Sequence, residues 1–238
     1  MALVDPAEPS LAALHDRARP VAPAGERLLP VPPGLDALLP GGALQRGWVV
    51  AVAGGTSLAL ALVAEASRSG SWSAAVAVGL PPLSPVAAGE VGVALERLLL
   101  VSAGPHSGRG GWAWATSAVV DAVDVVVAWP PPHLRAADAR RLAARARERG
   151  TVLVLAGTGW PDAVDVRLSL EEVAWEGIGR GHGRLLARRA VAVATGRGAA
   201  GRQRRVALWL PAPGGGVAPA ALTVVPMAVP MAVPAVPT

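Results

Sequence analysis

Between residues 48 and 156, short apolar runs alternate along the chain with longer segments of mixed polarity. The almost entirely apolar runs, each with the length of a strand, are 48–53, 74–78, 98–101, 123–128 and 151–156. The segments of helical length that lie between them are 56–69, 85–95, 112–120 and 135–149. Strands that are apolar throughout are buried on both faces, and a repeated strand–helix–strand order makes them parallel. The pattern therefore predicts an α/β fold with a mostly parallel central sheet and helices on both faces.

The order of elements changes after residue 160. Strand-like segments at 164–170, 185–195 and 203–210 follow one another without helices between them, and the turn 196–201 joins the last two. Strands joined directly by a short turn pair in antiparallel fashion. We therefore expect antiparallel strands, including a hairpin, at the C-terminal end of the sheet.

Both ends of the chain differ from this α/β region. Ser10 can cap a short helix that runs to Arg19, and the residues that follow are rich in Pro and Gly. Near the C-terminus, prolines recur every three or four residues and prevent a continuous helix, including one that could span a membrane. The domains that we expect are an N-terminal helix and linker over 1–29, a folded domain over 30–210 and a Pro-rich flexible tail over 211–238.

The composition excludes several kinds of chemistry. The 238 residues include no Cys, which rules out disulfides, thiolate catalysis and Cys-ligated metals. The 4 His are far apart in the sequence and lack the spacing of metal ligands, so we expect no metal site. The first residues do not have the pattern of a signal peptide, and we expect a cytoplasmic protein.

Positive charge is concentrated near the C-terminus. The formal net charge is +5, all 22 cationic residues are Arg, and no Asp or Glu follows Glu176. Residues 177–210 therefore form a basic loop and hairpin. The arginines in it that we expect to contact a partner or DNA are Arg180, Arg184, Arg188, Arg189, Arg202, Arg204 and Arg205. Because they flank two strands joined by one turn, we expect their guanidinium groups to gather on one part of the hairpin.

This basic block is open to several interpretations. Its arginines can be solvated charges that discourage edge-to-edge aggregation of the sheet. They can also contact a phosphate backbone or dock on an acidic protein surface. The combination of Gly and Arg at 177–184 suits close approach to phosphates, although an ordinary connector has the same composition. With no Lys and no aromatic residue nearby except Trp175, we expect any DNA binding to be weak and nonspecific.

A distinctive motif precedes the first predicted strand. Residues 34–39 read Gly-Leu-Asp-Ala-Leu-Leu, and residues 40–47 read Pro-Gly-Gly-Ala-Leu-Gln-Arg-Gly. This segment resembles the one that leads into the core of RecA-family ATPases. The resemblance implies a RecA-like core, in which the first strand continues into a Walker A loop whose amides and Lys hold the phosphates.

The chain departs from that family at the positions that carry the ATPase chemistry. Gly54, Gly55 and Thr56 look like the vestige of a Walker A loop, but the loop is shortened and Gly55 replaces the Lys. Counting back from the Leu-Ser-Pro turn after the second strand places Leu80 where the water-activating carboxylate belongs. Trp129 follows the strand at 123–128, where the Mg²⁺-binding Asp belongs. Phosphoryl transfer depends on these groups, so we expect no enzyme activity, no catalytic residue and no cofactor.

Over residues 30–210 the chain resembles in particular the ImuA group of RecA-like accessory proteins, in its actinobacterial ImuA-prime form. The segments that carry this resemblance are 54–60, 98–101, 112–115, 175–184 and 208–211. It implies a non-catalytic adaptor in damage-induced mutagenesis and translesion DNA synthesis. The implied partners are an inactive Y-family polymerase homologue of the ImuB type and an error-prone DnaE-type polymerase. Partner contact in that family is attributed to the C-terminal part, here the basic hairpin and tail.

Two other functions remain open at this stage. The basic block also suits a DNA-binding or RecA-modulating protein, with RecA as a further partner. SulA-type cell-division inhibitors share the same inert RecA-like core, and only a screen for partners distinguishes them from an adaptor.

Overall fold

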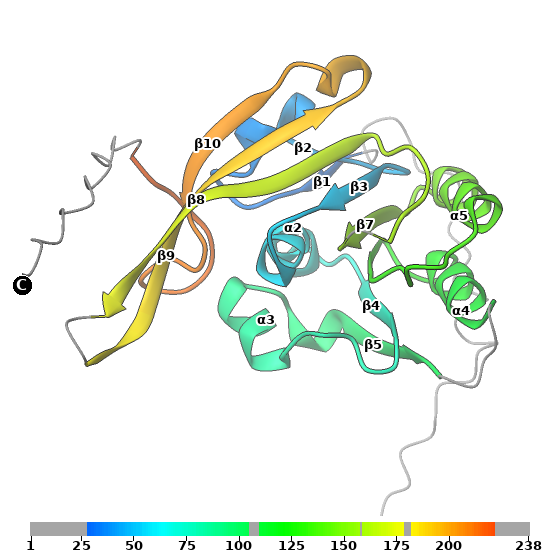
Figure 1. The fold of residues 1–238 in the computed structure, drawn as a ribbon, viewed down its shortest axis with the longest axis horizontal. Coiled ribbons are helices and arrows are strands. Elements are labelled where there is room, and N and C mark those ends of the chain that lie inside the picture. Colours follow the sequence, from blue (N-terminus) through cyan, green and yellow to red (C-terminus); the bar gives the residue numbers. More distant parts are fainter. Residues whose placement is uncertain (1–27, 105–109, 158, 179–181, 222–238) are drawn as a thin grey trace, which may run out of the picture.

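The protein is built around a nine-stranded sheet with the strand order β11-β10-β9-β8-β3-β7-β6-β4-β5 (Figure 1). The computed structural model describes residues 28–104, 110–157, 159–178 and 182–221. The mutually parallel strands are β3 Val49–Val52, β4 Ser73–Val78, β5 Leu98–Ala103, β6 Val125–Ala128, β7 Val152–Ala156 and β8 Val166–Ile178. The strands that follow in antiparallel fashion are β9 Gly183–Gly196, β10 Arg204–Trp209 and β11 Ala218–Pro219. The predicted α/β fold, with antiparallel strands at the C-terminal end, is confirmed.

Helices cover both faces of this sheet. They are α2 Thr56–Arg68, α3 Pro85–Val91, α4 Gly111–Val120 and α5 Ala136–Arg149. Successive side chains of a strand point to opposite faces, and β7 shows the result: Val152 and Val154 belong to the core under α2 and α3. Leu153 and Leu155 belong to the core under α4 and α5. This two-sided packing explains why the strands are apolar at nearly every position.

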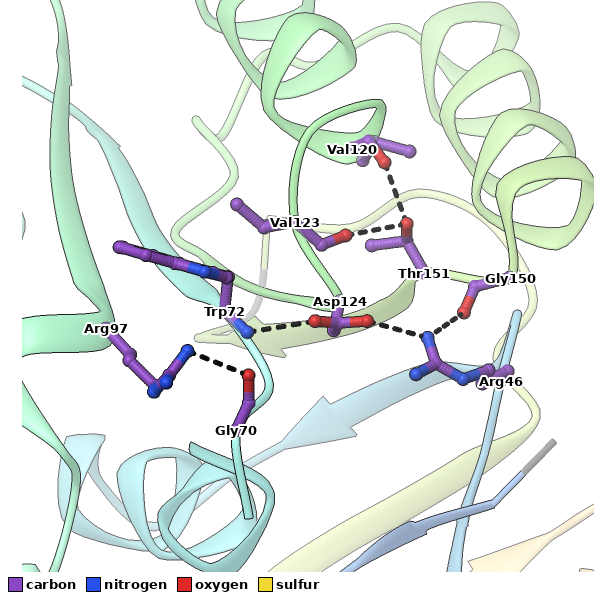
Figure 2. A network of polar contacts seen from close by, with 9 residues as sticks. All are labelled: Arg46, Gly70, Trp72, Arg97, Val120, Val123, Asp124, Gly150 and Thr151. Atoms are coloured by element: carbon purple, nitrogen blue, oxygen red, sulfur yellow. Dashed lines mark hydrogen bonds and ion pairs between the residues drawn. The ribbon is translucent and has the colours of Figure 1, made fainter. Parts of the chain in front are cut away.

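A buried polar network holds together the amino-terminal ends of several parallel strands (Figure 2). Asp124, which is 4 % exposed, accepts hydrogen bonds from the Arg46 guanidinium and the Trp72 amide, each at 2.9 Å. The Thr151 hydroxyl lies within hydrogen-bond distance of two acceptors, the carbonyl oxygens of Val120 and Val123, at 2.7 and 3.0 Å. The network thereby ties together the starts of β4, β6 and β7 and the turn that precedes β3.

Several boundaries differ from those expected. The helix predicted over 85–95 ends at Val91, because Gly92 adopts the left-handed conformation that terminates a helix. The strand predicted to end at residue 170 continues to Ile178. A second sheet, β1 Leu28–Pro30 with β2 Ala43–Gln45, was not predicted, since each strand has only three residues.

The predicted tail also begins later than expected. Residues 211–221 are packed on the domain, since β11 pairs with β10 and the Gly216 amide donates to the Glu90 carbonyl at 2.6 Å. A flexible tail from residue 211 is therefore wrong for 211–221. Residues 222–238 and the helix predicted from Ser10 to Arg19 lie outside the described residues. None of the helices in the described ranges is long and apolar enough to cross a membrane.

Candidate functional site

The turn between β3 and α2 occupies the place where the family resemblance implies a phosphate-binding loop. Only Ala53, Gly54 and Gly55 lie between the last residue of β3 and the first residue of α2. Ala53 still belongs to the sheet, since its amide donates to the Leu168 carbonyl of β8 at 2.8 Å. A nest of amides that curls round a phosphate needs more backbone than this turn provides.

Strand β8 closes the space beside that turn. Gly54 has a φ of +101°, and a Cβ atom built on it would lie 2.9 Å from the Leu170 amide nitrogen and 3.0 Å from the Leu170 Cβ. Real Cβ atoms essentially never come within 3.0 Å of such atoms. Gly54 is thus required by both its backbone conformation and the close approach of β8. Leu168 and Leu170 of β8 thus both contact this turn, through the Ala53 amide and beside Gly54.

The polar side chains at the start of α2 are engaged within the protein. The Thr56 hydroxyl donates to the Pro82 carbonyl at 3.4 Å. The Ser57 hydroxyl accepts a hydrogen bond from the guanidinium of Arg188, which reaches across from β9. Arg188 also donates to the Leu210 carbonyl at 2.7 Å and lies 5.3 Å from the centre of the Trp175 ring. Burial lowers the pKa of this guanidinium from its ordinary value, although an arginine stays protonated in proteins.

Leu80 and Trp129 come together in one cavity at the carboxyl ends of β4 and β6. The cavity has a volume of about 670 Å³, and its lining also includes Pro82, Trp112 and His133. The neighbouring strands explain the proximity, since the Trp129 amide donates to the Val76 carbonyl of β4 at 3.0 Å. Ligands of open α/β sheets usually bind in a crevice at this end of the strands. The two positions assigned from the sequence thus share one site.

This cavity has the wrong lining for a Mg²⁺–nucleotide. The described residues around it are apolar, apart from His133, and include no carboxylate and no Arg. A triphosphate and its metal ion need positive charge and oxygen ligands. In the part of the chain that the structure describes, no three His, Cys, Asp or Glu side chains form a group that could hold a metal ion. The geometry suits an uncharged ligand better than a nucleotide.

We expect excess Mg–ATP to leave the Tm of the protein unchanged within about 1 °C. A ligand present at a hundred times its Kd adds about 2.7 kcal/mol of stability, which raises the Tm of a chain of this size by roughly 5–10 °C. Differential scanning fluorimetry measures the shift, with an active RecA-family ATPase as the positive control. A saturable rise with increasing ATP would contradict the prediction.

The predicted gathering of arginines on one part of the hairpin is wrong. Arg204 and Arg205 pair with Ala194 and Val193 near one end of β9, whereas Arg189 pairs with Trp209 nearer the other end. Five residues along a strand span about 17 Å. The predicted hairpin already implied this separation, because the starts of two antiparallel strands joined by one turn lie at opposite ends of the pair. Arg188 adjoins Arg189 in β9, and Arg184 lies five residues from Arg189 at the start of the same strand. Arg202 comes two residues before Arg204, and Arg180 is outside the described residues.

A projecting two-stranded ribbon was not predicted. We call residues 171–178 and 183–188 the β8–β9 ribbon, which runs on past the neighbouring strands (Figure 1). β3 pairs with β8 only as far as Leu168, and β10 pairs with β9 from Arg189 onward. Its large exposed apolar side chains are Val173, Trp175, Leu185 and Leu186. An apolar residue in a strand usually indicates burial, so the sequence carried no signal for this surface beyond the basic residues around it.

Comparison with solved structures shows the fold. The crystal structure of the RadB recombinase matches with a TM-score of 0.52 and 16% sequence identity, over 78% of this chain and 96% of that one. At this level of identity, the likeness shows a RecA-like fold and no more. A search of curated proteins found no match.

Comparison with family models gives a more direct assignment. The MT3502 N-terminal domain matches residues 37–162, which run from the motif before β3 to the loop after β7. This region holds the β3–α2 turn and both strand-end positions, Leu80 and Trp129. Because the match covers more than half of the chain, the protein belongs to the MT3502 N-terminal domain family.

Proposed function

We propose that this RecA-like protein is a non-catalytic, cytoplasmic adaptor in damage-induced mutagenesis and translesion DNA synthesis. In this role it links an inactive Y-family polymerase homologue of the ImuB type to an error-prone DnaE-type polymerase. The RecA-like fold supports a protein related to RecA, and the sequence resemblance to ImuA supplies the partners. The assignment of the partners is our proposal.

The observation that carries this proposal is the β8–β9 ribbon. An isolated two-stranded ribbon is marginally stable in water, yet this one exposes Trp175, Leu185 and Leu186 by 44–51%. Leu185 and Leu186 are consecutive and therefore point to opposite faces, so both faces of the ribbon are partly apolar. Buried aromatic and apolar anchors surrounded by charged residues are typical of protein interfaces. A partner protein that covers the ribbon would remove this apolar surface from water.

The base of the same ribbon supports the non-catalytic part of the proposal. Leu170 fills the space beside Gly54, and Arg188 engages Ser57 at the start of α2. The strands that present the apolar residues thus also occupy the neighbourhood in which an ATPase would hold phosphates. We infer that β8 and β9 serve to dock a protein partner and that their contacts with the β3–α2 turn leave no room for nucleotide phosphates there.

The DNA-binding or RecA-modulating alternative is less favoured. Its support was the acid-free basic block that follows Glu176, and the pairing of β9 with β10 separates the arginines of that block along the hairpin. Arg205 is also paired with Glu171 at 2.9 Å, and Arg188 has the internal contacts described above. The SulA-like alternative shares the core and is distinguished by its partner.

We expect the ribbon to carry the contact with the ImuB-type partner. Replacing Trp175 by Ala, or Leu185 and Leu186 together by Asp, should weaken binding of the full-length chain at least about 30-fold, since an interface hot spot contributes 2 kcal/mol or more. Biolayer interferometry with purified ImuB-type protein measures the change. Trp114→Ala is a matched control, because Trp114 is 72% exposed on α4, away from the ribbon.

The outcomes separate the adaptor role from the position of its contact. No binding of the wild-type chain to an ImuB-type protein would overturn the adaptor proposal as a whole. Binding that the ribbon variants leave unchanged would keep the partner and exclude the ribbon as its docking surface. Circular dichroism of each variant shows whether it has folded.

A further inference from the structure

The cavity lined by Leu80 and Trp129 is also lined by a residue whose buried hydrogen-bond donor has no acceptor among the described residues. Trp112, which lines the cavity, is 3% exposed, and its indole Nε1 is buried with no hydrogen-bond partner among the described residues. A buried donor left without a partner destabilises the folded state, because its bond to water is lost and not replaced. Buried Trp N–H groups usually find an acceptor. An acceptor brought by a bound group would remove this cost.

The rest of the lining restricts the chemistry of that group. Leu80 is 85% exposed and Val78 is 50% exposed at the mouth of the cavity, and Trp129 and three prolines form much of the remaining wall. Side chains of this kind favour an uncharged, apolar occupant that also presents an oxygen acceptor. Grooves lined by aromatic residues recognise Pro-rich peptides in the extended polyproline conformation. The carbonyl oxygens of such a peptide have no internal hydrogen bonds and are available to an indole N–H.

One segment of this chain has that chemistry. Residues 222–238 contain no charged side chain and carry Pro226, Pro230, Pro234 and Pro237. The other long segment outside the described residues, 1–27, carries both acids and arginines and is a poorer match to an uncharged cavity. The composition of the cavity and that of the C-terminal segment are therefore complementary.

The length of the segment allows it to reach the cavity. The described chain ends at Ala221, two residues after β11, at the opposite edge of the sheet. Seven strand spacings separate β11 from β4, which corresponds to roughly 34 Å. The 17 residues 222–238 span roughly 53 Å in a polyproline helix. The last residues, including Pro234 and Pro237, can therefore lie in the cavity of their own chain.

We propose that this cavity binds the proline-rich C-terminal segment, residues 222–238, of the same chain. Pro234 and Pro237 pack against Leu80 and Trp129, and a peptide carbonyl accepts the hydrogen bond from Trp112 Nε1. The proposal concerns a different surface from the β8–β9 ribbon and does not depend on the adaptor role.

Disulfide trapping in the full-length chain tests this proposal, because the natural sequence has no Cys. The test protein carries Leu80→Cys and Ala235→Cys, and oxidised glutathione is the oxidant. We expect an intramolecular disulfide to form at least about 10-fold faster than in the control protein with Val86→Cys and Ala235→Cys. Val86 is 70% exposed on α3 and does not line the cavity. Mass spectrometry and non-reducing electrophoresis distinguish bonds within one chain from bonds between chains.

A second pair of substitutions tests the recognition of proline. Adding Pro234→Ser and Pro237→Ser to the test protein should lower its rate to that of the control. Equal rates in the test and control proteins would overturn the proposal. Disulfides formed only between chains would overturn it in favour of a second copy as the donor, and a rate unaffected by the Ser substitutions would exclude proline recognition. Leu80 and Val86 are both exposed, and circular dichroism checks that each variant has folded.

Discussion

Replacing Asp124 by Ala is expected to lower the free energy of unfolding by about 3–5 kcal/mol, the usual cost of removing one partner of a buried ion pair. The substitution leaves Arg46, whose side chain is 17% exposed, without the carboxylate it contacts at 2.9 Å. It also removes the acceptor of the Trp72 amide. Urea denaturation followed by circular dichroism measures the change in the free energy of unfolding.

A surface ion pair supplies the matched control for this prediction. Asp138 contacts Arg141 at 3.6 Å, and the Arg141 side chain is 83% exposed. Asp138→Ala should therefore cost no more than about 1 kcal/mol. Replacing both partners of the buried pair, as Arg46→Met with Asp124→Leu, should recover part of the loss because no uncompensated charge remains. Equal costs for Asp124→Ala and Asp138→Ala would contradict the account of the network.

Replacing Gly54 by Ala is the second substitution with a large expected effect, roughly 2–5 kcal/mol of destabilisation. The positive φ costs about 1–2 kcal/mol in a residue with a Cβ. The clash of that Cβ with Leu170 adds about 1–3 kcal/mol, which is typical of overpacking. Urea denaturation again gives the change in the free energy of unfolding.

Gly70→Ala separates these two causes. Gly70 has a φ of +102°, close to the +101° of Gly54, but a Cβ built on it meets nothing within 4 Å. It should therefore show the conformational cost alone. If the two substitutions destabilise equally, strand β8 does not press on the β3–α2 turn as the structure places it.

The sequence predicts the central sheet well because the physical cause is local. Strands buried on both faces must be apolar at nearly every position, and the runs at 74–78 and 151–156 coincide closely with β4 and β7. The strand ends follow from the same pattern, so counting along it placed Leu80 and Trp129 at positions that share one cavity. These are features that neighbouring residues determine.

The ribbon could not be predicted in the same way. Whether Trp175 is buried depends on which strand lies beside it, and β3 pairs with β8 only up to Leu168. A shift of strand register moves a side chain to another neighbour without any change in the local sequence. That Trp112 Nε1 has no partner among the described residues likewise depends on side chains from several elements. Such features require the tertiary structure.

The continuity of β8 has a mechanical consequence. This single strand pairs in parallel with β3 through Val166 to Leu168 and in antiparallel fashion with β9 along most of its length. A partner that pulls on the ribbon along its axis therefore loads the hydrogen bonds between β8 and β3 in shear. The same tension acts on Leu170 against Gly54 and on Arg188 against Ser57. Force applied at the ribbon is thus transmitted through these two contacts to the β3–α2 turn and the start of α2.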